Sequence, residues 1–329
     1  MLKPPVEQYE ARVAAPSRLH FGLLSFGEGD GRRFGGLGAM IDRPGLRLTL
    51  RGADRFTTEG PLAGRAAEFA RRVAAACDWK GDPPCAIQIE AAPPEHVGLG
   101  TGTQLGLAVA AALQPLLSPA PASVEQLAAM VGRGVRSAIG THGFASGGLL
   151  FEQGKLSDES LSPLAQRVAL PEAWRFVLFW PEDRRGLSGE SEREAFGRLP
   201  AIAPETTRML TAIAMKEILP AAAARDVAAF GDAIYRYGHA AGLCFGQYQP
   251  SAFASGRVAA LVDEIRKLGV PGVGQSSWGP TVFAVVPDED RAHTLAAHLE
   301  GDGEFPNLTW LIASPNNRGA EVTITSNPD

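Results

Sequence analysis

The sequence predicts an α+β protein with two domains. Its 329 residues exceed the length at which a single hydrophobic core usually stops growing, which is about 250 residues. Apolar and polar residues alternate in short stretches of the first third, as expected of β-strands. A strand, a helix and a second strand are predicted in succession near the other end, which indicates a separate α+β unit. We therefore expect one domain over residues 1–170 and another over residues 171–329.

The first domain is predicted to contain strands and helices on either side of a glycine-rich turn. Alternation predicts strands at residues 18–24 and 46–51, and again at residues 87–90. Apolar residues recur at helical spacing over residues 61–73 and 101–117, so two helices are expected there, the second of them mostly buried.

Further elements follow from capping and periodicity. Ser123 and Gln126 fit a capping box, so a helix is expected to begin there and to end near Gly132. In the second domain, a strand is predicted at residues 175–180 and Ala-rich helices at about 190–243 and 257–267. The terminal β-α-β series is predicted at residues 281–286, 288–299 and 308–313.

Composition and charge exclude several classes of protein. Apolar residues make up 45% and charged residues 20% of the chain, as in globular proteins. The net charge of -5 argues against a main role in binding nucleic acid or a membrane surface, so any phosphate site must be a local basic patch. Cys77, Cys85 and Cys244 are an odd number without C-x-x-C spacing, which favours neither a disulfide framework nor a zinc site.

Location and partners are expected to be those of a metabolic enzyme. Residues 1–10 lack the cationic and apolar regions of a signal peptide, and no apolar run approaches the roughly 18 residues of a membrane span. A cytoplasmic protein with small-molecule substrates is therefore expected, with no nucleic-acid or membrane partner. A homodimer is left open.

The most informative stretch lies between a predicted strand and a predicted helix. Residues 93–104 read Pro-Pro-Glu-His-Val-Gly-Leu-Gly-Thr-Gly-Thr-Gln. Glycines let the backbone direct several N–H groups toward one point, and the helix dipole adds positive charge, so the expected ligand is a phosphate or pyrophosphate. The alternative is a glycine turn that merely starts a helix.

Better-known sites are excluded by spacing. No G-x-x-x-x-G-K-[ST] motif is present, and Gly98-Leu99-Gly100 lacks the third glycine and the following acid of a dinucleotide-binding loop. No Ser-His-Asp, zinc-ligand or paired-carboxylate arrangement is indicated by spacing either.

Three ordered motifs give the chain a specific resemblance. Pro-x-x-x-x-Gly-Leu-Gly at residues 93–100 resembles the phosphate loop of the GHMP superfamily, which includes small-molecule kinases. Residues 15–22 (Ala-Pro-Ser-Arg-Leu-His-Phe-Gly) and residues 272–281 (Gly-Val-Gly-Gln-Ser-Ser-Trp-Gly-Pro-Thr) match two further signatures. The resemblance implies a ribosomal-protein-S5-like first domain and a ferredoxin-like second domain, with the active site in the cleft between them.

Within that superfamily the chain is most similar to the β-ribofuranosylaminobenzene 5'-phosphate synthases. That resemblance implies a reaction of phosphoribosyl pyrophosphate with 4-aminobenzoate, or a 4-hydroxy analogue, to give a C-riboside, carbon dioxide and pyrophosphate early in tetrahydromethanopterin synthesis. Mg²⁺ would arrive chelated by pyrophosphate, with few dedicated protein ligands, and no organic cofactor is expected. The matching stretches are residues 17–20, 31–38, 98–105, 132–140, 186–190 and 274–281.

Two departures from the related families concern the acid or base. Many GHMP kinases carry an aspartate in the segment that spans residues 140–148 here, and this chain has no acid there, which favours the synthase. Archaeal synthases carry acids near the positions of Ser25 and Phe34, and their absence leaves the general acid or base open. An ATP-dependent GHMP kinase and a non-catalytic ligand sensor therefore remain as alternatives.

The predicted site residues lie in or beside the glycine-rich motifs. Arginine's planar fork suits phosphate and carboxylate, and histidine could donate to phosphate or accept a proton. Arg133 also lies beside such a turn. Trp278 could pack on the aromatic acid, but a place in the core is expected more. The predicted catalytic residues are Arg32, His20 and His142, and the predicted substrate- or phosphate-binding residues are Arg18, Arg33, Gly98, Gly100, Thr101, Gly102, Thr103, Gln104, Arg136, Gln275, Ser276, Ser277 and Gly279.

Overall fold

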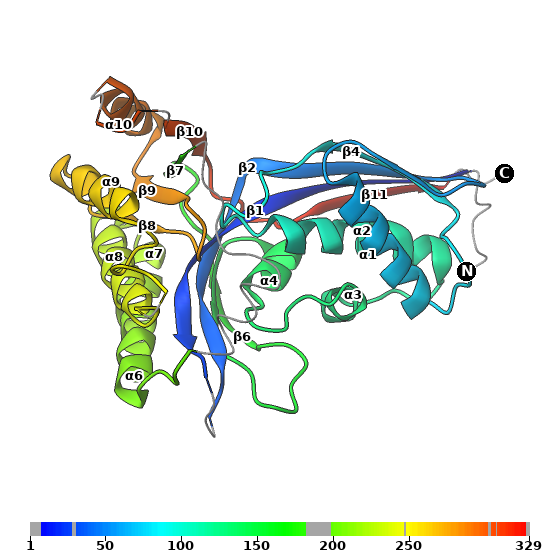
Figure 1. Ribbon diagram of the computed structural model, residues 1–329, viewed down its shortest axis with the longest axis horizontal. Coiled ribbons are helices and arrows are strands. Elements are labelled where there is room, and N and C mark those ends of the chain that lie inside the picture. Colours follow the sequence, from blue (N-terminus) through cyan, green and yellow to red (C-terminus); the bar gives the residue numbers. More distant parts are fainter. Residues whose placement is uncertain are drawn as a thin grey trace.

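The protein consists of two α+β units, the second of which packs against two long strands of the first. The computed structural model describes residues 8–27, 31–181, 199–246, 248–301, 304–306 and 308–326. Figure 1 shows a long twisted sheet with helices α1 to α4 on one side, and a second unit of helices and short strands against the far end of β1 and β2. No helix within these ranges combines the length and the apolar character that a membrane crossing requires.

The first sheet is built around two long neighbouring strands. Its main path runs β11-β1-β2-β4-β3, and β5 extends it by pairing with β2 and with β6. Register shifts between Ala15 and Ser17 and between His20 and Gly22 interrupt the β1–β2 ladder. The strands are β1 (Tyr9–Ser25), β2 (Phe34–Gly52), β3 (Thr57–Glu59), β4 (Cys85–Ala91), β5 (Leu149–Glu152), β6 (Leu164–Val168) and β11 (Glu321–Ser326).

Helices cover one face of this sheet because each has an apolar side. In α1, Phe69 and Val73 are buried against the sheet, while Arg71 is exposed. The predicted capping box is confirmed, since Ser123 and Gln126 exchange both hydrogen bonds at the start of α3. The helices are α1 (Ala63–Ala76), α2 (Thr101–Leu117), α3 (Val124–Met130) and α4 (Ile139–Ser146).

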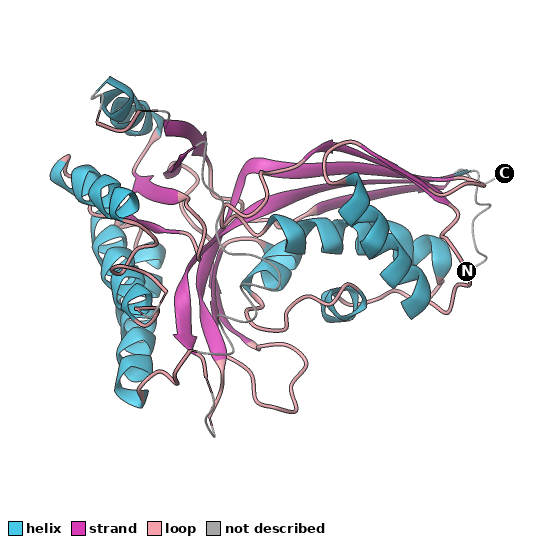
Figure 2. Cartoon of the chain, in the orientation of Figure 1, coloured by secondary structure: helices cyan, strands magenta, loops and turns pink. Residues whose placement is uncertain are grey.

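The second unit has the alternation of a ferredoxin-like fold. Its antiparallel sheet has the order β10-β7-β9-β8, and helices separate the first from the second strand and the third from the fourth. Figure 2 shows these helices beside the short sheet. The strands are β7 (Arg175–Pro181), β8 (Val273–Gln275), β9 (Val282–Val286) and β10 (Leu308–Ala313), and the helices are α6 (Pro204–Ile213), α7 (Leu219–Ala223), α8 (Val227–Leu243), α9 (Gly256–Lys267) and α10 (Glu289–Gly301).

Two sequence expectations require correction. The helical stretch expected at about 190–243 is divided between Ala223 and Val227, where Arg225 has φ of 60° and Asp226 caps the next helix. Before that break, a π-helical turn at Ala214–Ile218 precedes Pro220, which has no N–H to continue the α-helical pattern. Residues 182–198 lie outside the described ranges. The second domain does not run unbroken to residue 329, because β11 pairs with β1 in the first sheet. The Asp42 amide donates to the Ser314 carbonyl at 3.0 Å and the Ser314 amide donates to Oδ1 of Asp42 at 2.7 Å, and these two hydrogen bonds hold the chain where it returns to that sheet.

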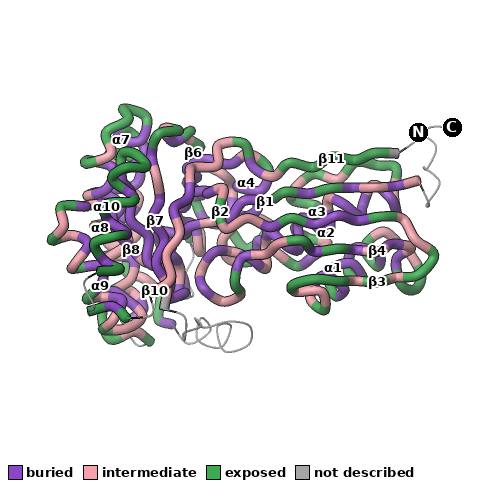
Figure 3. Tube along the Cα trace, turned by 90° about the horizontal axis from the view of Figure 1, so that it is seen from above, coloured by how far each residue is buried: buried purple, intermediate pink, exposed green. Residues whose placement is uncertain are grey.

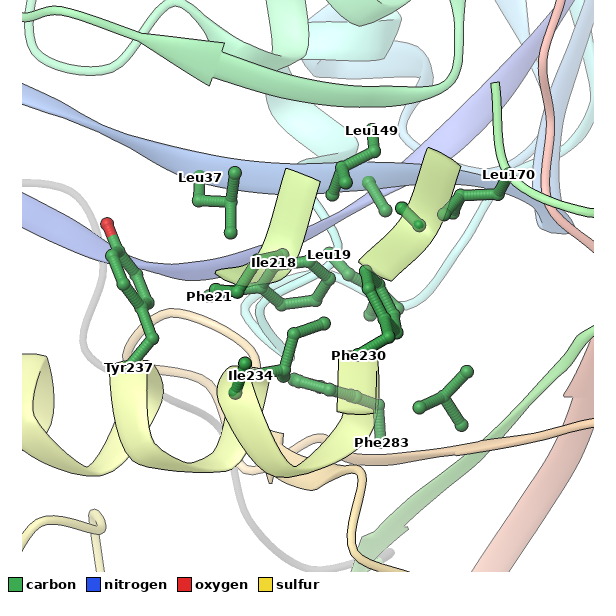
Figure 4. Close-up of a cluster of buried hydrophobic side chains, with 14 of the residues drawn as sticks. Leu19, Phe21, Leu37, Leu149, Leu170, Ile218, Phe230, Ile234, Tyr237 and Phe283 are labelled. Carbon is green, nitrogen blue, oxygen red and sulfur yellow. The ribbon is translucent and has the colours of Figure 1, made fainter. Parts of the chain in front are cut away.

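One hydrophobic core joins the two units. Figure 4 shows Leu19, Phe21 and Leu37 of the first sheet facing Phe230 and Ile234 of α8, with all five side chains almost fully buried. Figure 3 shows the same concentration of buried positions where the central strands meet the second unit. Because the shared core fixes the units relative to each other, loops from both can build one site.

Candidate phosphate and substrate site

The glycine-rich loop at residues 98–104 leads into α2, as predicted. Gly100 is the N-cap of α2 in the left-handed conformation, with φ of 73°, and no side chain caps this helix end. The amides of the first turn and the helix dipole are therefore directed toward a position suited to an anion. The hydroxyl of Thr101, a predicted phosphate-binding residue, donates instead to the Pro94 carbonyl at 3.0 Å.

Three guanidinium groups gather beside the first turn of α2. The carbons at the centres of Arg65, Arg72 and Arg133 lie 6.0, 6.0 and 5.1 Å from the centroid of the Phe69 ring. A methyl group on Gly102 would clash with the Arg65 guanidinium and lie 3.2 Å from Nη2 of Arg133. The three arginines, called the arginine cluster below, thus surround Phe69, and Arg65 and Arg133 also lie close to the first turn of α2 at Gly102.

Charge around the loop is mainly positive. Glu95 pairs with Arg65 at 2.5 Å and offsets part of the charge of the arginine cluster. On another side of the loop, Nη1 of Arg18 lies 3.4 Å from the Gly98 carbonyl, and Nε would lie 3.3 Å from a methyl group on Gly100. Arginine donors on more than one side suit a ligand with several anionic oxygens.

Arg65 and Arg72 were missed at the sequence level, although a signal exists. Arg65, Phe69 and Arg72 occupy positions i, i+4 and i+7 of one helix, which places them on one face. Arg133 lies between two glycines in the sequence, but its approach to α2 depends on the fold.

Removing one guanidinium of the arginine cluster is expected to weaken pyrophosphate binding about tenfold. A charge-assisted hydrogen bond contributes about 1.5–3 kcal/mol, and about 1.4 kcal/mol corresponds to tenfold in affinity. Calorimetric titration with pyrophosphate would compare Arg65→Ala and Arg133→Ala with Arg71→Ala. Arg71 lies on the same helix but pairs with exposed Asp82, so it serves as a control. Equal affinity in all three variants would remove the cluster from the site.

The second unit contributes a loop that holds the glycine-rich loop in place. The buried Ser276 hydroxyl donates to the Gly98 carbonyl at 2.7 Å and accepts from the His20 amide at 3.1 Å. Ser277 donates its amide to the His20 carbonyl at 2.9 Å. Gly279 contacts the backbone at Val97 so closely that a side chain would clash. These predicted binding residues thus use their polar groups to join the two units.

Two other residues of this loop are also occupied by the protein itself. The side chain of Gln275 accepts from the Ala254 amide at 2.8 Å and donates to the Ser277 carbonyl at 2.8 Å. Trp278 packs edge to face on Phe245 at 5.0 Å between ring centroids, which confirms its expected place in the core.

His20 belongs to a buried hydrogen-bond chain. Its Nε2 lies 3.1 Å from Oγ of Ser137, whose hydroxyl donates to Oε1 of Glu152 at 2.7 Å. Burial lowers the pKa of His20 well below its ordinary value, and the neighbouring Arg18 charge adds to this. Burial raises the pKa of Glu152 to about 7 against hydrogen bonds from Ser137 and the Ala138 amide. The ring of His20 is therefore neutral near pH 7.

Ser137 and Glu152 were not predicted as site residues. The sequence signal was an acid, Glu152, that directly follows three apolar residues. In the structure these four residues form the strand Leu149–Glu152, and all of them are buried. Buried carboxyl groups are rare unless they are paired, so such a position marks a candidate site.

Arg32, Arg33 and His142 lie around a different loop. Nη1 and Nη2 of Arg32 bond the two carboxylate oxygens of Glu159 at 2.7 and 3.1 Å, and this pairing lowers the pKa of Glu159. Arg33 pairs through its backbone with Lys155, and Nε2 of His142 lies 2.8 Å from the Ser162 carbonyl. Among the described residues, no hydrogen bond joins these three to the glycine-rich loop.

The remaining predicted residues lie in the first turn of α2 or just before α4. Gln104 is buried and its amide donates to the Gly140 carbonyl at 2.9 Å, which ties α2 to α4. The methyl group of Thr103 also lies close to Gly140, 3.1 Å from the position of an added methyl group. Arg136 is partly exposed and directly precedes Ser137. The predicted motif at residues 186–190 lies outside the described ranges.

The donor set does not resemble a protein-held metal site. The described ranges contain no group of three or more His, Cys, Asp or Glu side chains placed to hold a metal ion. The groups around the glycine-rich loop are cationic or backbone amides, which suit an anion. We therefore assign no step of the chemistry to a metal held by these residues.

Comparison with known proteins agrees with the motifs. The family model described as GHMP kinases N terminal domain matches residues 62–148, and that described as GHMP kinases C terminal matches residues 218–303. Together they span just over half of the chain. The glycine-rich loop and the arginine cluster lie within the first match, and the loop at residues 274–281 lies within the second.

Proteins named β-ribofuranosylphenol 5'-phosphate synthase are similar over nearly their full length. The one from Methanothermobacter thermautotrophicus is 29% identical over 335 residues, covering 94% of this chain and 98% of that protein. The one from Archaeoglobus fulgidus is 29% identical over 330 residues, covering 95% and 99%. These similarities confirm the resemblance drawn from the sequence motifs.

Solved structures confirm the two-domain α+β fold. Mevalonate diphosphate decarboxylase from Staphylococcus aureus has a TM-score of 0.66 at 16% identity, covering 96% of this chain and 99% of that one. Homoserine kinase from Cytophaga hutchinsonii has a TM-score of 0.61 at 17% identity, covering 98% and 100%. At such low identity the likeness concerns the fold alone.

Proposed function

Because the chain belongs to the GHMP superfamily, we propose that it is a phosphoribosyl-transferring C-riboside synthase. Its substrates are phosphoribosyl pyrophosphate and 4-hydroxybenzoate or 4-aminobenzoate, and it releases carbon dioxide and pyrophosphate. The observation that carries the proposal is the similarity, over 94% of this chain, to a protein named β-ribofuranosylphenol 5'-phosphate synthase. The phenol in that name favours 4-hydroxybenzoate as the acceptor. A role in tetrahydromethanopterin biosynthesis follows from the same proposal.

The anion-binding groups around α2 fit the departure of pyrophosphate. As the bond from ribose C1 to pyrophosphate breaks, negative charge grows on the leaving group and positive charge grows on C1. Arg18, Arg65 and Arg133, together with the amides at the start of α2, can stabilise that negative charge. Stabilisation that strengthens as the charge develops accelerates the reaction rather than merely tightening binding. Mg²⁺ is proposed to arrive with the pyrophosphate.

Arg32 and Arg136 are proposed to bind the other anionic groups, with His142 nearby as a further donor. The fork of Arg32 already holds the carboxylate of Glu159 through two hydrogen bonds of 2.7 and 3.1 Å. A benzoate carboxylate or a phosphate presents oxygens with the same spacing, so it can take the place of Glu159. The Arg32–Glu159 pair is partly exposed, which makes the exchange accessible from solvent.

The proposal predicts release of labelled carbon dioxide from carboxyl-labelled 4-hydroxybenzoate in the presence of phosphoribosyl pyrophosphate and Mg²⁺. One pyrophosphate should appear for each carbon dioxide, because both leave in the same turnover. Parallel reactions with 4-aminobenzoate would identify the acceptor. Arg65→Ala should slow both products together, whereas Arg71→Ala should not.

The rival functions give different products. A kinase of this superfamily would convert ATP to ADP with an alcohol such as homoserine or mevalonate and release no carbon dioxide. A ligand sensor would bind phosphoribosyl pyrophosphate without consuming it. Either result would overturn the proposed synthase.

A further inference from the structure

The His20–Ser137–Glu152 chain connects elements that are far apart in sequence. His20 lies on β1, Ser137 precedes α4 and Glu152 ends β5. His20 and Glu152 are buried, and the two hydrogen bonds through Ser137 measure 3.1 and 2.7 Å. The second carboxylate oxygen of Glu152 accepts from the Ala138 amide at 2.7 Å. These hydrogen bonds therefore form a continuous path along which protons can move.

The direction of each hydrogen bond follows from the number of hydrogens available. The Ser137 hydroxyl has one hydrogen, and it points to Glu152, while the Ile139 amide at 3.3 Å also donates to Ser137. Toward His20, Ser137 can then only accept, so Nε2 of His20 carries the hydrogen. Nδ1 of the neutral ring holds a lone pair and can accept a proton.

Resting on the proposed function, we propose that Ser137 and Glu152 position His20 as the base for the aromatic substrate. His20 takes the proton of the para hydroxyl or amino group through Nδ1. In the same step, Nε2–H passes to Ser137 and the Ser137 hydrogen passes to Oε1 of Glu152, which becomes a neutral carboxyl group. His20 is the catalytic residue in this scheme, and Ser137 and Glu152 are positioning residues.

The electron flow balances without an oxidant or reductant. The electron pair of the broken O–H or N–H bond moves through the ring to the carbon that bears the carboxylate, and this carbon bonds to ribose C1. Pyrophosphate leaves with the electrons of its bond to C1. Carbon dioxide then leaves, its bonding pair restores the aromatic ring, and the proton returns from Glu152 along the same chain to the para substituent.

The surroundings of Glu152 suit a group that must take and release a proton. Its raised pKa, about 7, means that neither form is strongly favoured near neutral pH. Ser162 supplies a further hydrogen bond, and Arg18 lies close enough to favour the charged form. On the α8 side, Tyr237 interacts with Glu152 electrostatically while its hydroxyl donates to the Gly22 carbonyl.

The competing explanation is that Glu152 merely caps α4 through the Ala138 amide, and Glu152→Gln separates the two. The single amide oxygen of glutamine is needed by Ala138, so its NH₂ group faces Ser137. Ser137 must then turn its hydrogen toward His20, which moves the ring hydrogen from Nε2 to Nδ1. Simple capping predicts unchanged turnover in Glu152→Gln, because the amide oxygen still accepts from Ala138.

The first test needs no substrate. Nitrogen NMR of the ¹⁵N-histidine-labelled protein would identify the His20 tautomer, with the resonances assigned by their loss in His20→Gln. The Nε2–H form is expected in the wild type and in Glu90→Gln, in which another carboxylate bonded to a hydroxyl, Thr49, is changed. Glu152→Gln should show the Nδ1–H form. The same tautomer in all three proteins would overturn the proposal, whatever reaction the enzyme catalyses.

The second test uses turnover of phosphoribosyl pyrophosphate and 4-hydroxybenzoate. Glu152→Gln should lower kcat at least tenfold with little change in KM for phosphoribosyl pyrophosphate. The fall in wild-type kcat below about pH 7, expected as Glu152 takes a proton, should disappear in the variant. Normal kcat in Glu152→Gln would contradict the proton chain.

If Glu152→Gln does not fold, Ser137→Ala still tests the proposed proton chain. It breaks the chain but leaves Glu152 bonded to Ala138, so it should lower kcat at least tenfold as well. Unchanged kcat and an unchanged His20 tautomer in Ser137→Ala would also contradict the proton chain. Absence of carbon dioxide release by the wild type would count against the proposed function alone, because the NMR result stands independently.

Discussion

Gly98→Ala is expected to lower the free energy of unfolding by about 3 kcal/mol or more. Gly98 has φ of 94°, a conformation that an L side chain rarely adopts. A methyl group there would clash with the Ser276 carbonyl oxygen and lie 3.2 Å from Cα of Gly279. Because both neighbours are backbone atoms, no side-chain rotation can relieve the clash, and the contact between the two units must shift.

The same substitution at Gly64 provides a matched control. Gly64 lies in the first turn of α1, and a methyl group there would meet nothing within 4 Å. Gly64→Ala is therefore expected to stabilise the protein by about 0.5–1 kcal/mol, because alanine restricts the unfolded chain and favours a helix. Urea denaturation of both variants would measure the difference. Equal stability of Gly98→Ala and Gly64→Ala would contradict the proposed tight contact between the loops.

Glu152→Gln is expected to gain stability relative to the wild type as the pH rises. In the folded wild type, burial raises the pKa of Glu152 from its ordinary 4.5 to about 7. The folded state therefore binds a proton more tightly than the unfolded state. The stability that this proton supplies is fully present below about pH 4.5 and is lost as the pH rises through about 7. Glutamine does not titrate, so the variant lacks this loss.

The expected size is set by the pKa shift. A shift of this extent corresponds to roughly 3 kcal/mol, since one pKa unit is about 1.4 kcal/mol. The free energy of unfolding of Glu152→Gln minus that of the wild type should rise by about this amount between pH 4.5 and pH 8. Urea denaturation at several pH values would measure it, with Glu90→Gln as a control for the same substitution on an exposed strand position. A constant difference across that range would show that Glu152 does not titrate as described.

Local patterns in the sequence determined most helices and strands and the position of the glycine-rich loop. The α2 helix and its glycine start were predicted because apolar spacing and glycine conformations act over a few residues. The capping box at Ser123 and Gln126 was predicted for the same reason, since all its partners lie within three residues of each other. The order of the three motifs along the sequence also indicated the superfamily, because it does not depend on which residues touch in the fold.

Only the tertiary structure decided which distant residues meet. Arg65 reaches Gly102 because α1 packs on α2, and Ser276 bonds Gly98 because the shared core fixes the second unit against the first sheet. The carboxyl group of Glu152 meets His20 through Ser137 because β5 pairs with β2, which in turn pairs with β1. Sequence spacing describes the near neighbours of a residue along a helix or strand. Which segments pack together depends on how the folded protein buries its apolar surface as a whole. Contacts between residues more than a hundred positions apart can therefore be seen only in the folded structure.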